Sequence, residues 1–169
     1  MSGNTWKILI QNNEFGAVEG AMGIGDQGIQ ILRNDNNGTL NLTADNNMIV
    51  NTTNEGIRIY TAFTGSANLN SLIRAANNSF NSIGAAEALY AWTSGNANSC
   101  FHITGNTGNG AGGAPSGSIR LHQEGSSILR ITQASTANLS TDNNGATVNT
   151  GGTISFDGTC TDPPLPTLP

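Results

Sequence analysis

The cysteines and histidines are the residues of this chain with the most distinct chemistry, because both types can bind a metal ion. Cys100 and His102 are two positions apart, so they share a face if they lie on a β-strand. His122 and Cys160 complete the set. A structural zinc site usually draws on close pairs such as C-x-x-C, which this chain lacks. We therefore expect no metal and no cofactor, and we keep His102 and His122 as the only metal candidates.

The two cysteines have a second use, because Cys100 and Cys160 could form a disulfide with each other. Disulfides form and persist in oxidising compartments and are rare in the cytosol. A protein made in the cytosol would keep free thiols, whereas one released by lysis or carried on an extracellular particle could oxidise late. The sequence leaves both states open.

Tyr90 and Trp92 share the period-two spacing of a strand face, and rings of this kind could stack on a sugar. The alternative is that they fill a core. Motifs for catalysis are missing: the sequence has no G-x-S-x-G, no H-E-x-x-H and no dinucleotide-binding glycine motif. The 11 acidic residues stand apart from one another, whereas glycoside hydrolysis needs two carboxyl groups close together. We therefore expect a protein that is not an enzyme.

Composition limits the class of protein and of partner. The net charge is −5 and charged residues make up only 10% of the 169 residues. The few basic residues are scattered, so we expect no nucleic-acid partner. We also expect no membrane span and no signal peptide, since the start Met-Ser-Gly-Asn has neither a basic nor an apolar segment. Asn and Gly, at 24 and 22 residues, favour tight turns and hence a β-rich fold.

Short runs with alternating apolar residues, such as WKILIQ and GIRIYTAFT, recur along the chain and predict strands. Three segments differ from this pattern. Helical spacing predicts one short helix over about 67–76, and residues 88–104, ALYAWTSGNANSCFHIT, predict a β-hairpin. Residues 105–118 are rich in glycine and predict a loop, because a phosphate-binding loop would need a following helix and usually a lysine.

Two stretches of the sequence nearly repeat each other. GIQILRNDNNGTLNLTADNN begins at Gly28 and GSSILRITQASTANLSTDNN begins at Gly125, and they match at I-L-R, T-x-N-L and D-N-N. The match predicts one β-unit used twice, over residues 17–64 and 114–160, with residues 65–113 inserted between the copies. Convergent strand composition is the alternative explanation.

These patterns place residues 1–161 in a single β-rich domain. The two copies would pack as the sheets of an all-β fold, mainly an antiparallel β-sandwich of jelly-roll type; the alternative is a β-solenoid in which they are equivalent segments. Residues 162–169, DPPLPTLP, would form an extended proline-rich C-terminal arm.

The alternation of short β-runs with Asn, Gly and Thr turns, as in GTLNLTADNN, GIRIYTAFTG and GSSILRITQ, resembles virion structural proteins of tailed bacteriophages. These include capsid decoration or cement proteins, head fibres and tail spikes. The resemblance implies a non-enzymatic structural protein that decorates or stabilises a phage capsid, or projects from it as a fibre or spike. It also implies a homo-oligomer, a trimer, with a major capsid or tail protein as partner. Its location would be the virion, after synthesis in the host cytoplasm.

The two ends of the chain are the expected partner-binding arms, with these residues: Trp6, Lys7, Pro163, Pro164, Leu165, Pro166 and Leu168. Two other functions fit the same sequence. The first is a receptor- or glycan-binding tail-tip module that uses Tyr90 and Trp92. The second is a self-assembling extracellular filament subunit, in which an arm completes the sheet of a neighbour.

Overall fold

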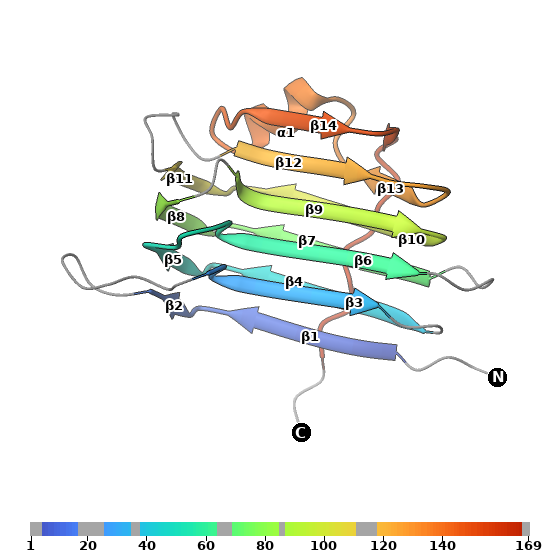
Figure 1. Ribbon diagram of the computed structural model, residues 1–169, viewed down its shortest axis with the longest axis horizontal. Helices are drawn as coiled ribbons and strands as arrows, with labels where there is room; N and C mark the ends of the chain where they lie inside the picture. Colours follow the sequence, from blue (N-terminus) through green and yellow to red (C-terminus); the bar gives the residue numbers. More distant parts are fainter. Residues whose placement is uncertain are drawn as a thin grey trace.

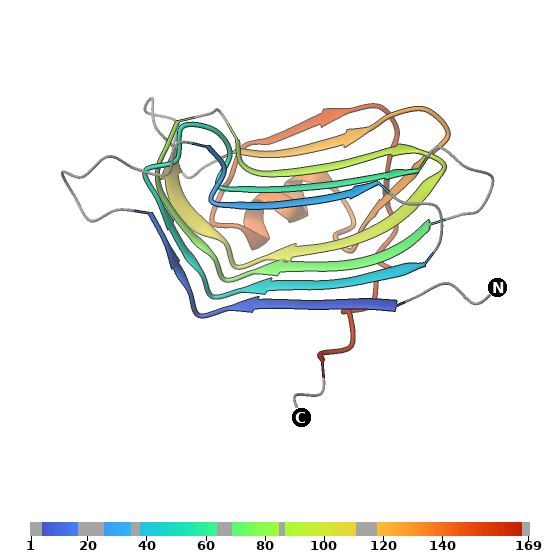
Figure 2. The same ribbon diagram turned by 60° about the horizontal axis from the view of Figure 1, so that its bottom comes forward.

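The computed structural model describes residues 5–16, 26–34, 38–63, 69–84, 87–110 and 118–166. Within these residues the chain forms a parallel β-solenoid of about four turns (Figure 1). Each coil contributes a strand to three sheets in turn, which have six, four and five strands. Figure 2 shows the coils stacked on one another, with the short four-stranded sheet closing one side.

The six-stranded sheet has the order β1 (Thr5–Gln11), β4 (Thr39–Asp45), β7 (Leu69–Ala76), β10 (Ala97–Thr104), β13 (Ile128–Ile131) and β15 (Ile154–Phe156). The four-stranded sheet has the order β11 (Thr107–Gly110), β8 (Ser79–Ile83), β5 (Met48–Val50) and β2 (Glu14–Phe15). The five-stranded sheet has the order β14 (Val148–Gly151), β12 (Ser118–Gln123), β9 (Glu87–Gly95), β6 (Ile57–Phe63) and β3 (Ile29–Asn34). The described helix, α1, spans Thr136–Asp142.

The all-β class is confirmed, and so is the solenoid alternative, whereas the antiparallel sandwich or jelly roll is wrong. Every strand pair among the described residues is parallel. Strands that follow each other in the chain lie in different sheets, and pairing joins strands about one coil apart. Asn and Gly corners look the same in both architectures, so turn signals alone could not separate them.

Two local predictions in the middle of the chain are also wrong. The predicted helix over 67–76 is instead β7, in which Ile73 and Ala75 point into the core. Residues 88–104 are not a hairpin, because β9 and β10 belong to the five- and six-stranded sheets on opposite walls. The turn between them places Gly95 at φ 65°, a left-handed conformation that suits glycine. In the predicted loop over 105–118, residues 107–110 form β11, and residues 111–117 lie outside the described residues.

The predicted duplication does not coincide with the structural repeat. An offset of 97 places β3 of the five-stranded sheet over β13 of the six-stranded sheet, and β4 over α1. The backbone repeats once per coil instead: Thr5 pairs with Thr39, and Thr39 pairs with Asn70. The period is therefore about a third of the predicted one, and the central residues 65–113 are ordinary coils rather than an insert in the part that is described.

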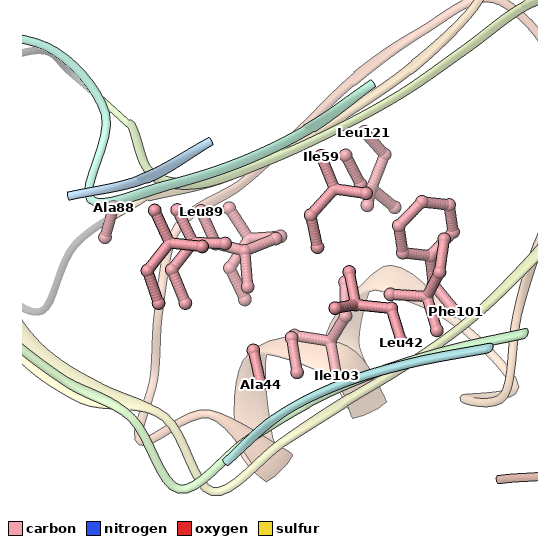
Figure 3. Close-up of a cluster of buried hydrophobic side chains, with 14 of the residues drawn as sticks. Leu42, Ala44, Ile59, Ala88, Leu89, Phe101, Ile103 and Leu121 are labelled. Atoms are coloured by element: carbon pink, nitrogen blue, oxygen red, sulfur yellow. The ribbon is translucent and has the colours of Figure 1, made fainter. Parts of the chain in front are cut away.

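Alternation along each strand builds the core. Figure 3 shows the apolar side chains that meet between the two large sheets: Leu42, Ala44, Phe101 and Ile103 from one, and Ile59, Ala88, Leu89 and Leu121 from the other. Most are fully buried. Stacked coils bring like residues above one another, so each coil continues the apolar interior of the one before it.

A ladder of buried asparagines runs along the corner between the six- and four-stranded sheets. The side-chain Oδ1 atoms of Asn47, Asn78, Asn106 and Asn143 each accept hydrogen bonds from the backbone N–H and the side-chain Nδ2 of the asparagine one coil earlier. These bonds measure 2.8–3.2 Å. The Nδ2 of Asn78 also donates to the carbonyl of Ala44 at 3.0 Å. The ladder thereby satisfies buried backbone groups at each corner.

The residue that precedes Asn13, Asn47, Asn78 or Asn106 makes the corner possible, whereas Asn143 follows the last residue of α1. Asn12, Asn46 and Asn77 have φ of 58°, 52° and 54°, and Gly105 has φ of 66°. Asparagine and glycine tolerate this left-handed conformation better than other residues. The doublet Asn-Asn, or Gly-Asn, is thus the sequence signature of the corner.

The two ends of the solenoid differ. At the C-terminal end, α1 follows β13 and buries Leu139 in the core, with Ser135 accepting a hydrogen bond from Asn138 N as N-cap. At the N-terminal end, β1, β2 and β3 each have a neighbour strand on one side only among the described residues. Trp6 points to the interior row above Leu40 but stays 48% exposed. We call this end, formed by β1, β2 and β3, the open end.

Replacing Asn78 by Ala should destabilise the fold strongly. The change removes the hydrogen bonds that Asn78 makes with the N–H of Asn47 and the carbonyl of Ala44, and it leaves the Nδ2 of Asn47 with the carbonyl of Ile10 as its remaining acceptor. We expect a loss of about 3 kcal/mol, or roughly 10 °C in melting temperature, measured by circular dichroism. Asn149→Ala, at an exposed position of β14, is the matched control, and equal melting temperatures for the two variants would contradict the role of the ladder.

Candidate ligand-binding face

The outer face of the five-stranded sheet carries two rows of side chains that run across the strands. The aromatic row comprises Leu32, Tyr60, Trp92, His122 and Gly151. The arginine row comprises Gln30, Arg58, Tyr90, Arg120 and Asn149. Both rows follow directly from the strand register, because residues paired across parallel strands lie side by side.

Strand alternation decides that these side chains face outward. In β6, Ile57 and Ile59 are fully buried in the core, so Arg58 and Tyr60 between and after them point to solvent. In β9, Leu89 and Ala91 are likewise buried in the core, so Tyr90 and Trp92, which alternate with them, lie on the outer side of the sheet. A one-residue slip in register would bury the aromatic side chains, and burial of the isoleucines opposes it.

The rings of the two rows pack against one another. Trp92 lies at the centre: its ring centroid is 4.6 Å from that of Tyr60, 5.8 Å from that of Tyr90 and 5.4 Å from that of His122. Tyr90 and Trp92 are stacked, with 12° between the ring planes, and His122 meets Trp92 edge-on at 88°. Such aromatic pairs stabilise neighbouring strands and hold each ring in one orientation.

Two guanidinium groups flank this aromatic cluster. Arg58 lies 5.7 Å from the Tyr90 ring and 5.8 Å from the Trp92 ring, and Arg120 lies 5.2 Å from the Tyr90 ring. All three distances fit cation–π contacts. Arg120 also forms an ion pair with Glu87 at 3.3 Å, whereas Arg58 forms no ion pair with any residue in the described part of the chain.

The phenol of Tyr90 has a shifted pKa. Burial raises the pKa of the phenol above its ordinary value. The charges of Arg120 and Arg58 lower it, and those of Glu87 and Glu55 raise it further. The shift is upward because loss of solvation outweighs the attraction of the two guanidinium groups for a phenolate.

Three polar nitrogens of the cluster are enclosed by side chains and have no hydrogen-bond partner among the described residues. They are Arg58 Nε, Trp92 Nε1 and His122 Nδ1. The first two carry an N–H and can only donate. His122 Nδ1 lies over Gly151, where an added Cβ would come within 2.6 Å of it. Tyr60, in contrast, shares a 2.9 Å hydrogen bond with Ser94.

The structure brings the two predicted sugar-stacking residues together and adds four neighbours. Tyr90 and Trp92 lie on β9, on the outer side of the five-stranded sheet, although Tyr90 is only 9% exposed. The neighbours are Tyr60, a ring of the same kind, His122, which the sequence offered only as a metal candidate, and Arg58 and Arg120, which sequence reasoning missed. The sequence signal that could have found them is the alternation shared by I-R-I-Y and I-R-L-H. In both motifs the second and fourth residues point outward, and the strand register places them in the same two rows, two coils apart.

The predicted metal candidates lie on different faces. His122 belongs to the cluster just described, and His102 lies on the outer face of the six-stranded sheet, 2.5 Å from Asp162. Cys100 and Cys160 are joined in a disulfide with Cα atoms 5.5 Å apart. In the described ranges no group of three or more His, Cys, Asp or Glu side chains could hold a metal ion.

The C-terminal arm is a strap over the chain's own sheet. Residues 157–166, which we call the strap, run back along the six-stranded sheet toward the open end (Figure 1). Cys160 ties the strap to β10, and Asp162 pairs with His102 and with Arg74 of β7. Pro163 is buried. The strap therefore covers its own β10 and β7.

The other predicted arm residues have separate places. Trp6 and Lys7 are not in an arm: they belong to β1, the edge strand of the six-stranded sheet. In the strap, Pro164 and Leu165 are exposed and Pro166 is half-buried. Leu168 lies outside the described residues.

Comparisons with protein-family models, with curated proteins and with solved structures give no match to this chain. Among the described residues, the single short helix, α1, is far from the length and hydrophobicity that crossing a membrane requires. The function is therefore argued from the geometry alone.

Titration of Tyr90 tests how tightly the cluster is packed. The chain has two tyrosines, so Tyr60→Phe leaves Tyr90 as the only phenol. We expect its ultraviolet titration midpoint to lie above the ordinary value of about 10, and the same variant unfolded in urea should titrate at that value. Since the raised pKa favours the neutral phenol in the fold, the stability contributed by Tyr90 should be complete below about pH 10 and decline as pH rises through the raised pKa. A folded midpoint at or below the unfolded one would contradict the packing.

Removing the disulfide should loosen the strap and lower stability. The bond closes a loop with a sequence separation of 60, and a cross-link of this kind contributes about 3 kcal/mol by restricting the unfolded chain. The double variant Cys100→Ser, Cys160→Ser should lose about that much in urea denaturation and be cut faster by endoproteinase Asp-N before Asp162. Ser126→Ala, at an exposed position in the turn before β13, is the control. An unchanged cleavage rate would mean that the strap is held without the disulfide.

Proposed function

We propose that this protein is a non-enzymatic virion structural protein, one that decorates or stabilises a phage capsid or projects from it as a fibre or spike. The open end is the attachment end in this proposal, and the helix-capped end points away. The difference between the two ends is the observation that carries the proposal.

The open end has the chemistry of an assembly surface. Unpaired backbone groups of an edge strand are a template for another strand, and solenoids need a cap to avoid such contacts. Here Trp6 and Leu32 are exposed at 48% and 58%, and Ile8, Ile10 and Ile31 are only partly buried. A subunit of a particle gains by docking this end, because docking pairs the edges and covers the apolar side chains.

The rest of the molecule suits a structural role. The asparagine ladder, the stacked core and the disulfide-tied strap all resist opening of the coils. A rigid rod with one attachment end is what a fibre, spike or decoration subunit requires. The predicted homo-oligomer, a trimer, and the predicted major capsid or tail partner are parts of this proposal.

A second function, the receptor- or glycan-binding tip, is favoured by a different observation. The aromatic and arginine rows cover one outer face and lie away from the strap, on the opposite sheet. A tip module and a particle subunit are compatible, since attachment would use the open end and recognition would use this face. The filament subunit, the remaining alternative, would also use the open end.

A charge at the open end should block self-association of the pure protein. We expect light scattering of the wild type at high loading to give a multiple of 17.4 kDa, with the trimer as the sequence-based prediction. Trp6→Glu should lower the mass to that of one chain, because docking would bury the new carboxylate. The first coil should persist, since Arg33, 5.5 Å from the Trp6 ring, faces the new carboxylate.

Ile128→Glu is the matched control. The exposed fraction of Ile128, 50%, is close to that of Trp6, 48%. Ile128 lies on β13, however, which is far from the open end. This variant should keep the mass of the wild type, and circular dichroism should show the same fold for all three proteins. A wild type with the mass of a single chain at every concentration would contradict the assembly proposal.

A further inference from the structure

The outer face of the five-stranded sheet has features of a binding site that the assembly proposal does not use. We propose that the aromatic and arginine rows form a binding site for a linear acidic oligosaccharide that lies across the strands, along the solenoid axis. The site comprises Tyr60, Trp92 and His122 from one row and Arg58, Tyr90 and Arg120 from the other. It is independent of the open end.

The first argument is charge. None of the ten residues in the two rows is acidic, although acidic residues outnumber basic ones 11 to 6 in the chain. Of the two carboxylates near Tyr90, Glu87 is bound by Arg120 and Glu55 accepts a hydrogen bond from Gln27 at 3.0 Å. Arg58 forms no ion pair with a described residue and lies against the rings of Tyr90 and Trp92. Guanidinium groups bind carboxylates and sulfates well because their N–H groups match two oxygens at once.

The second argument is the supply of donors. Arg58 Nε and Trp92 Nε1 lie in neighbouring positions of the two rows and donate to no described residue, and His122 Nδ1, which donates or accepts according to the tautomer, has no described partner either. Buried donors without acceptors cost free energy, and most are satisfied in native proteins. A ligand rich in acceptor oxygens satisfies them after small side-chain rotations. A sugar carrying acidic groups is such a ligand, whereas an apolar ligand is not.

The third argument is spacing. Adjacent strands lie about 4.8 Å apart, which is close to the length of one pyranose unit in an extended glycan. Residues of one kind therefore recur along the rows at about the repeat of the sugar chain. The C–H faces of pyranose rings can rest on Tyr60 and Trp92, while acidic groups reach Arg58 and Arg120. Arg120 is exposed, Arg58, Tyr60 and Trp92 are half-buried and Tyr90 is buried, so an extended chain would lie over the rows and contact the outer edges of the rings.

The site is tested on an immobilised array of oligosaccharides that carry uronate, sialate or sulfate groups, beside neutral oligosaccharides of equal length. The full-length wild type should bind acidic members and not their neutral counterparts, and binding should weaken as ionic strength rises. Arg58→Gln should reduce affinity by about tenfold or more, as expected for the loss of a charged hydrogen bond. Trp92→Ala should abolish binding.

Arg130→Gln is the matched control, because Arg130 is an outward-facing arginine of β13 on the opposite sheet, bonded to Asn98 at 2.8 Å. It should bind like the wild type. Melting curves establish that each variant is folded. The salt dependence of binding is measured on the wild type, so it remains a test even if a variant fails to fold. Binding of neutral members alone, no binding at all, or equal binding by wild type and Arg58→Gln would overturn the site. None of these outcomes bears on the molar mass that tests assembly through the open end.

Discussion

A buried amide at one corner of each coil is the interaction on which the rest of this molecule depends. The chain must turn sharply where it leaves the six-stranded sheet, and the turn takes backbone N–H and carbonyl groups away from water. Asn47, Asn78 and Asn106 satisfy those groups with one side chain per coil, which also bonds to its counterpart above. The side-chain amide of an asparagine is long enough to bridge one strand spacing and no more. This contact therefore fixes the position of each coil relative to the next.

Fixed coil register has consequences on both outer faces. On the five-stranded sheet it lines up Tyr60 with Trp92 and His122, so that residues about thirty positions apart in sequence become one continuous surface. On the six-stranded sheet it lines up Arg74 with His102, which together hold Asp162 of the strap. The same ladder thus supports a candidate recognition surface on one wall and a fastening for the C-terminal segment on the other. The open end is where this stacking stops, and its half-exposed side chains are the consequence.

Much of the candidate site could be read from alternation, but not its extent. The spacing of Tyr90 and Trp92 shows that they share a face, and the sugar-stacking hypothesis began there. Arg58 and Arg120 could not be added from sequence, because their closeness to Tyr90 depends on which strands are neighbours. A hairpin over 88–104 would have paired β9 with β10. In that arrangement Arg58, Arg120 and Tyr90 would not have met. The pairing of Cys100 with Cys160 was foreseen as one of two states, since two cysteines allow only one bond.

The sequence by itself determined that this protein is built from short strands with Asn and Gly corners, and which residues of each strand point inward. Those properties are local: they follow from alternation and from the left-handed conformation that asparagine and glycine accept. Only the tertiary structure decided that the strands pair in parallel one coil apart, that residues 69–76 are a strand, and that the proline-rich segment folds back on its own sheet. The physical reason is that a strand carries no record of its partner. Partner choice depends on which arrangement buries the apolar faces while satisfying the corners, and here the stacked asparagines satisfy them only between successive coils.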